Sequence, residues 1–321
     1  RTLALALGSV QLLERLGAWP AAEAAPILEV HVSQAPPTLP AALAEAAVHL
    51  RAADEGVAQL GAVLPYGRLV APLQRAWQAR VAAAPERAAM RFGAPVAGLK
   101  PVAGGVEVDA GIAETFDLAV VAEGGVFADA DRRALGGDER AAWRHDYGQT
   151  AWVGTVELEG LPAGLAIERF TRQGPVALLP LPGGDLQRRR ASLVWCVTTD
   201  DDPVRDLSPE QRRTVLATLL PEVAGRLLGV GPLKHFALGL HAERTLAQGR
   251  LVRIGNAAQT LHPVAGQGLN LGLRDAWALV DALRDHDGDV ERAVSRIEWA
   301  RAPDRWAMIA ATDFLARSFT W

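Results

Sequence analysis

Cysteine and long apolar runs are scarce in this sequence, and each scarcity excludes a class of protein. Cys196 is the only cysteine among 321 residues, so a disulfide framework and a thiolate metal site are both excluded. It lies in an apolar run typical of a strand, where a buried structural thiol is expected. No stretch approaches about 18 uncharged apolar residues, which argues against a spanning helix. The first residues also lack the charged-then-apolar layout of a signal peptide.

Lysine is equally scarce, because the basic residues are almost all arginine. Lysine occurs only at Lys100 and Lys234, and the formal net charge is −4. No basic stretch is interleaved with aromatic residues, so nucleic acid is not an expected partner. The histidines show no ligand spacing, and no metal site is expected. Hydrophobic residues make up 50% of the chain, which is enough for one large core or two ordinary domains.

The most informative stretch follows an apolar strand predicted over 251–254. Gly266, Gly268 and Gly272 punctuate the loop after it, and a helix then continues to 285, with Asn270 in its capping region. Gly272 leaves room for another backbone to approach the helix closely. Free amides at a helix start bind anions or electron-rich oxygens, because they and the helix dipole point outward. An ordinary strand-to-helix turn is the alternative that these residues alone leave open.

The remaining signals come in the order α/β, antiparallel sheet, α/β. Helices are predicted over 9–16, 68–84, 208–228 and 290–301, and strands over 27–32, 94–101, 105–110, 116–122, 152–158, 165–171, 176–180 and 192–198. The continuous apolar run at 116–122 favours a parallel strand covered on both faces. We therefore predict an α/β protein with two interleaved, discontinuous domains. One comprises 1–25, 62–145 and 246–321, and the other 26–61 and 146–245. Ligands favour such junctions, at the carboxyl ends of parallel strands.

Residues 255–272, with the sequence GNAAQTLHPVAGQGLNLG, resemble the second flavin fingerprint of class A FAD-dependent aromatic monooxygenases. These enzymes have the p-hydroxybenzoate hydroxylase fold. The Asn-Ala-Ala-Gln variant is similar to the 2-polyprenyl-6-methoxyphenol hydroxylase branch of ubiquinone biosynthesis. Residues 168–180 and 192–196 resemble substrate-domain strands of that branch. The resemblance implies that the first domain is a Rossmann-like FAD-binding domain and the second a substrate-binding domain.

The resemblance also implies which residues of this loop hold FAD. Gly255 and Asn256 would face its ribityl and phosphate region, and Pro263 would lie over the ring near its reactive carbon. The backbone of Gly268, Leu269 and Asn270 would meet the pyrimidine edge, within the loop that Gly266 opens. Helix amides there would stabilise negative charge on the reduced ring. His262 joins Pro263 as a catalytic candidate, although a loop histidine beside proline more often has a positioning role.

Other parts of the chain carry further cofactor candidates. Arg1 and Arg68 match family positions that touch the cofactor, with a plain surface arginine as the alternative for each. Glu123 and Gly124 stand where the family has an Asp-Gly pair, and the extra methylene of glutamate alters that contact. The family's opening GxGxxG loop is not among these residues. Either about 30 residues of a βαβ unit precede Arg1 in the intact protein, or half of the flavin site is lacking.

The activity implied by the resemblance is FAD-dependent hydroxylation of a polyprenylated phenol. NAD(P)H would be the reductant, and O₂ would react through a flavin C4a-hydroperoxide, in a pocket that excludes water. The expected pocket wall is the antiparallel sheet around Phe170, Leu178, Leu179, Val194 and Trp195, with plain core as the alternative. A cytoplasmic protein is expected, with peripheral contact to the inner membrane and membership of a quinone-biosynthesis complex left open. Two rivals remain: a class A hydroxylase of a small soluble aromatic, and a flavin-free truncated scaffold subunit.

Overall fold

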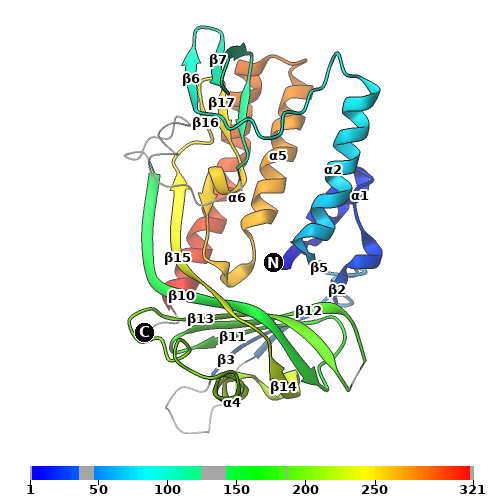
Figure 1. Cartoon of the computed structure of the whole chain (residues 1–321), viewed down its shortest axis with the longest axis vertical. Coiled ribbons are helices and arrows are strands. Elements are labelled where there is room, and N and C mark those ends of the chain that lie inside the picture. The colour runs from blue at the N-terminus through cyan, green and yellow to red at the C-terminus, as the bar shows by residue number, and fades with distance from the viewer. Residues whose placement is uncertain (1, 36–46, 124–141, 186, 319–321) are drawn as a thin grey trace.

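The structure, a computed structural model, describes residues 2–35, 47–123, 142–185 and 187–318. Figure 1 shows a large twisted sheet at one end of the molecule and a half rich in helices stacked on one face of that sheet. The long strands β10 and β15 run from the helical half into the large sheet and so belong to both. The two halves are therefore joined by continuous strands as well as by packing.

The large sheet has nine strands in the order β18-β15-β10-β13-β12-β11-β3-β4, with β14 also paired to β10. Its strands are β3 (Glu29–Gln34), β4 (Ala47–Arg51), β10 (Ala142–Glu159), β11 (Leu165–Thr171), β12 (Gly174–Gly184), β13 (Arg189–Thr198), β14 (Arg226–Val230), β15 (Lys234–Glu243) and β18 (Gln259–Thr260). Neighbouring strands pair antiparallel except β3 and β11, which are parallel. This confirms the antiparallel sheet expected from the successive strands predicted over 152–198.

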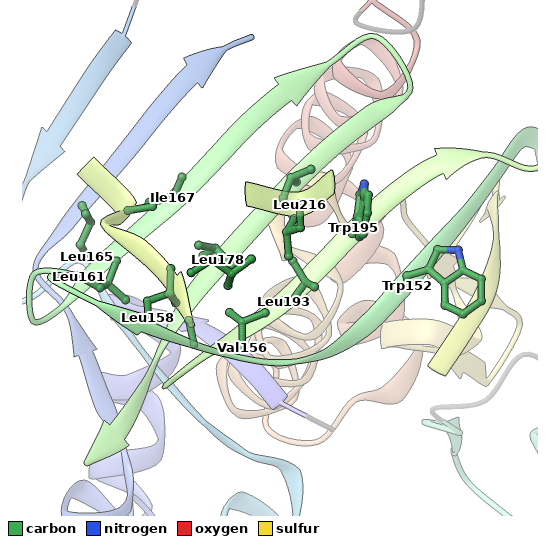
Figure 2. Packing of buried hydrophobic residues seen from close by; sticks show 14 of the residues in the cluster. Trp152, Val156, Leu158, Leu161, Leu165, Ile167, Leu178, Leu193, Trp195 and Leu216 are labelled. Atoms are coloured by element: carbon green, nitrogen blue, oxygen red, sulfur yellow. The ribbon is translucent and has the colours of Figure 1, made fainter. Parts of the chain in front are cut away.

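One face of this sheet packs against α4 (Pro209–Leu219). Side chains alternate between the two faces of a strand, and Leu178 and Trp195 lie on the face that meets Leu216 of α4 (Figure 2). We call the opposite face, which carries Ala166 and Leu179, the inner face. The expected pocket wall is therefore wrong for Leu178 and Trp195, which belong to the α4-side core. By the same alternation Phe170, Leu179 and Val194 lie on the inner face.

Among the described residues, the helical half contains three small sheets and four helices. The sheets have the orders β1-β5-β2, β6-β7-β8 and β16-β17-β9. Their strands are β1 (Thr2–Ala6), β2 (Ala25–Ile27), β5 (Gly61–Pro65), β6 (Gly98–Val102), β7 (Gly105–Asp109), β8 (Ala113–Phe116), β9 (Ala119–Val121), β16 (Ala247–Gln248) and β17 (Leu251–Arg253). The helices are α1 (Leu7–Arg15), α2 (Tyr66–Ala83), α5 (Gly268–Asp285) and α6 (Val290–Ser318). Strands β9 and β17 are parallel, as predicted, but Val120 of this edge strand is 43% exposed, so β9 is not covered on both faces.

Two of the predicted helices differ from the structure. The helix expected over 208–228 starts at the predicted cap, with Ser208 and Gln211 forming a complete capping box, but it ends at Leu219. Pro221 and Gly225, whose φ is +73°, redirect the chain into β14, and β14 pairs with β10. The last helix runs on to Ser318 although Pro303 lies inside it. The division into domains stays a prediction.

No helix in the described ranges combines the length and the apolar character needed to cross a membrane.

Candidate functional site

The glycine-rich loop leaves the carboxyl end of β17 and enters α5. It contains two short 3₁₀ turns, η3 (Gly255–Ala257) and η4 (Pro263–Ala265), and then Gly266 in the left-handed region at φ +59°. Gln267 precedes the first turn of α5 without making a side-chain cap bond, and that turn holds no acidic residue. The first amides of a helix have no partner within the helix. The start of α5 thus presents donors and the positive end of its dipole to the space beside the loop.

Asn270 lies in the first turn of α5, where Gln267 is the N-cap, and its side chain braces the loop. Its side-chain oxygen accepts hydrogen bonds from the backbone N–H of Ala6 (2.9 Å) and from the hydroxyl of Ser9 (2.8 Å). Its amide nitrogen donates to the carbonyls of Ala4 (3.3 Å) and Gly266 (3.1 Å). One buried side chain therefore ties the loop to β1 and to the first turn of α1.

The predicted close approach at Gly272 is confirmed. A Cβ built on Gly272 would lie 2.9 Å from the Cα of Gly255, which is closer than real Cβ contacts come. Gly255 itself has φ +58°, a conformation that favours glycine. The loop and α5 therefore pack backbone against backbone, and both partners need to be glycine.

His262 fastens the other end of the loop to the large sheet. Its Nδ1 accepts a hydrogen bond from the backbone N–H of Val264 (3.2 Å), so the proton of the neutral ring sits on Nε2. Nε2 lies 2.8 Å from Oε1 of Gln149 in β10, and the ring of Tyr147 contacts the imidazole edge-on at 5.1 Å between centroids. Burial lowers the pKa of His262 to about 4. The imidazole is therefore neutral at physiological pH and is held at both nitrogens, which suits a positioning role.

A buried ionic network supports the loop from behind, and the sequence reasoning missed it. Asp275 of α5 accepts hydrogen bonds from the backbone N–H of Gly255 (3.2 Å) and the side chain of Gln259 (2.8 Å), and it pairs with Arg301 of α6 at 2.9 Å. Arg305 donates to the side chain of Gln259 (2.6 Å) and to the carbonyl of Glu243. Val280 of α5 is apolar but 62% exposed. Leu271, Asp275 and Leu279 are buried instead. The spacing of Asp275, four residues from each leucine, is the sequence pattern that could have indicated a buried carboxylate.

The remaining predicted site residues lie at the edges of this arrangement. Arg68 is an exposed residue in the first turn of α2, where it pairs with Glu23 at 3.1 Å. Its neighbour Leu69 shares a hydrophobic cluster with Leu269, so the start of α2 lies near the start of α5. Arg1 and Gly124 fall outside the described residues.

Glu123 is exposed and follows β9. Because β9 and β17 are parallel, with Val121 opposite Arg253, the carboxyl ends of both strands meet at one edge, and Glu123 comes to the level of Gly255. A recess of about 250 Å³ between β9 and the β6–β7 hairpin ends at Glu123. Glu123 and the glycine loop therefore share one edge of this small sheet.

The residues present fit the isoalloxazine end of FAD. Gly266 is exposed, and a Cβ added to it or to Gly268 would meet only ordinary contacts, with Ala4 at 3.7 Å and Asn256 at 3.8 Å. A flat ring can therefore approach the backbone there, opposite helix amides that favour negative charge. Within the described ranges, no group of three or more His, Cys, Asp or Glu side chains is placed to hold a metal ion.

Comparison with known proteins gives this geometry a context. The FAD binding domain family matches residues 161–289. The ubiquinone hydroxylase UbiL of Rhodospirillum rubrum is 38% identical over 180 residues, which are 54% of this chain and 41% of that protein. The 3-demethoxyubiquinol 3-hydroxylase of Escherichia coli is 32% identical over 202 residues, which are 60% of this chain and 49% of that protein. The chain thus spans about half the length of the curated relatives it matches.

Solved structures share the fold at lower identity. PqsL of Pseudomonas aeruginosa in complex with 2-aminobenzoylacetate aligns with a TM-score of 0.75 and 20% identity over 100% of this chain and 86% of that one. HpxO of Klebsiella pneumoniae, complexed with FAD and uric acid, aligns with a TM-score of 0.70 and 18% identity. The alignment covers 98% of this chain and 78% of HpxO. By sequence this chain is similar to ubiquinone hydroxylases over about half of their length, and its fold is shared with PqsL and HpxO.

Proposed function

We propose that the protein is an FAD-dependent monooxygenase that hydroxylates a polyprenylated phenol of ubiquinone biosynthesis. The observation that carries the proposal is the glycine loop at the start of α5, whose open backbone and unshielded amides suit an electron-rich flat ring. Similarity to two bacterial proteins, a ubiquinone hydroxylase and a 3-demethoxyubiquinol 3-hydroxylase, supports the choice of a quinone precursor over other aromatic substrates. NAD(P)H is the proposed reductant and O₂ the proposed oxidant.

Bound FAD would supply the redox and oxygen chemistry, and the protein would supply binding, orientation and charge stabilisation. Gly255 and Asn256 would hold the ribityl and phosphate region, and Pro263 would lie over the ring. The amides of Gly268, Leu269 and Asn270 would face the pyrimidine edge, where the positive end of the α5 dipole stabilises negative charge.

The braces around the loop would keep these donors in place. Asn270 fixes the loop to β1, and Asp275 fixes Gly255 to α6 through Arg301. We assign His262 a positioning role, because its two nitrogens are engaged by Val264 and Gln149. Such preorganised donors need no rearrangement when charge develops. Glu123, Arg68, Arg1 and Gly124 remain proposed cofactor contacts.

The test measures NAD(P)H oxidation by the FAD-loaded protein with 2-prenylphenol and with 4-hydroxybenzoate. We expect 2-prenylphenol to stimulate oxidation and to gain one oxygen atom, measured by mass spectrometry. Stimulation by 4-hydroxybenzoate alone would refute the prenylphenol assignment in favour of a hydroxylase of a soluble aromatic. A protein that does not bind FAD would refute the oxygenase altogether and leave a scaffold role.

A polyprenyl substrate partitions into bilayers, so the proposed function includes peripheral contact with the inner membrane and an association with other quinone-biosynthesis proteins. Co-sedimentation with phospholipid vesicles that contain a polyprenylated phenol tests the membrane contact. We expect more protein in the pellet than with vesicles lacking the phenol.

A further inference from the structure

A half-buried glutamate on the large sheet, Glu168, has no part in the arrangement described so far. Glu168 lies in β11 between Ile167, which packs in the α4-side core, and Arg169, whose Nε donates to the carbonyl of Leu219 in α4 (3.0 Å). Side chains alternate along a strand, so Glu168 points to the inner face. Its Oε1 is closed to solvent and has no hydrogen-bond partner among the described residues. An unpaired buried carboxyl is costly, which makes it a candidate for binding a ligand.

The inner face around Glu168 carries small side chains together with Phe170 of the same strand and Val194, which pairs with Ala177. Glu168 pairs across the sheet with Ala177 of β12, and Cys196 pairs with Ala151 one row away. Burial, and then the charge of Glu168, raise the pKa of the Cys196 thiol, so the carboxyl and the thiol are neighbours in space. Ala177 of β12, Cys196 of β13 and Ala151 of β10 all carry small side chains.

The same face meets the glycine loop directly at Gln149 and indirectly through Ala4 of β1. Ala166, two residues before Glu168 on the same face, shares a cluster with Ala4, and Ala4 lies 3.7 Å from the position of a Cβ on Gly266. Two residues along a strand span about 7 Å. Across the sheet, Gln149 of β10 holds His262, which directly precedes Pro263. Glu168 therefore lies on the same face of the sheet that contacts the glycine loop.

The chemistry of Glu168 matches that of a phenol. Burial raises its pKa to about 8, and no cation contributes to this shift. An ordinary glutamate, with a pKa near 4.3, would be a much weaker base toward a phenol, whose pKa is about 10. A base works best when its pKa lies near the working pH.

We propose that Glu168 is the catalytic base that receives the proton of the substrate's phenol hydroxyl, an inference that rests on the proposed function. In this step the phenol O–H bond breaks and an O–H bond forms on a Glu168 oxygen. The electron pair stays on the ring oxygen and makes the ring a better nucleophile. After oxygen transfer the ring carbon gives up its hydrogen as a proton to water, and the ring oxygen, again a phenolate, recovers its proton from Glu168. No further oxidant or reductant enters these proton transfers.

The first experiment needs no turnover. Binding of 2-prenylphenol and of its O-methyl ether to the FAD-loaded, oxidised protein is followed by quenching of tryptophan fluorescence at about pH 9 and about pH 6.5. We expect the wild type to prefer the phenol about tenfold at the higher pH, where Glu168 is ionised, and less at the lower. Glu168→Gln should lose this pH-dependent preference. Glu157→Gln, which alters an exposed glutamate of the same sheet, should keep it. An unchanged preference in Glu168→Gln overturns the proposal.

The second experiment measures hydroxylation of 2-prenylphenol against pH. We expect kcat of the wild type to rise through about pH 8. Glu168→Gln should lower kcat/KM about tenfold at pH 8, and the deficit should shrink toward pH 10, where the phenol ionises by itself. A variant with the wild-type profile overturns the assignment. If no protein turns over but the binding preference depends on Glu168, the proposed function fails while Glu168 stays the partner of the phenol.

Discussion

Replacing Gly272 by alanine perturbs a place where α5 meets the loop backbone against backbone. The new Cβ would lie 2.9 Å from the Cα of Gly255 and 3.6 Å from its nitrogen. Carbon atoms pack best at about 3.5–4.0 Å, so helix and loop would have to separate by about 0.6–1 Å. The contacting atoms belong to the backbone and cannot rotate away. Gly255 is further held because its N–H donates to Asp275.

The magnitude follows from two opposing effects. Overpacking of this kind costs about 1–3 kcal/mol. Removing a glycine from a helix contributes about 0.5–1 kcal/mol in the other direction. We expect a net loss of about 1–2 kcal/mol in the free energy of unfolding. Because the displaced backbone would carry the amides that face FAD, we also expect the Kd for FAD to rise about tenfold.

Urea denaturation measures the first quantity and flavin fluorescence the second. The matched control is Gly67→Ala in α2, where no atom lies within 4 Å of the new Cβ and φ is not in the left-handed region. The control should gain up to about 1 kcal/mol and bind FAD like the wild type. If Gly272→Ala is as stable as the control and retains FAD, the close backbone packing does not shape the cofactor site.

Three further substitutions test the supports of the loop. Asn270→Ala should lower the free energy of unfolding by about 2–4 kcal/mol in urea, because it leaves buried backbone groups unpaired; a loss below about 0.5 kcal/mol would show that the brace is dispensable. Asp275→Asn should cost about 1.5–3 kcal/mol because Arg301 loses its buried partner and keeps only Asp304, and an unchanged Tm would contradict this. Protonation of His262 is disfavoured in the folded protein, so stability should fall by on the order of 3 kcal/mol as pH drops from about 6.5 to 4. His262→Gln should flatten that acid limb, and a limb equal to that of the wild type would assign it to other groups.

Local patterns predicted the glycine loop and its neighbourhood well. The strand before it, the helix after it and the tight approach at Gly272 follow from apolar period and glycine spacing, and the structure confirms them. The start of α4 at Ser208 was equally predictable from the sequence, because Ser208 and Gln211 have the spacing of a capping box. Such features depend on residues close together in sequence. They could therefore be predicted without knowing which distant segments meet.

Features that depend on distant contacts were not predictable in this way. The turn at Pro221 and the following strand β14 depend on pairing with β10. The helix α6 continues past Pro303, and buried contacts of Arg301 and Arg305 anchor it on both sides of the proline. The burial of Asp275 depends on a partner in another helix. The face on which Leu178 or Glu168 points is likewise set by sheet packing.

The central claim is that the backbone from Pro263 to Asn270 holds the isoalloxazine of FAD. Amide hydrogen–deuterium exchange with and without FAD measures this contact directly on the purified protein. We predict that FAD slows exchange in the peptide covering these residues and leaves the exposed hairpin of β6 and β7 unchanged. Binding of FAD with unaltered exchange at this loop would contradict the account.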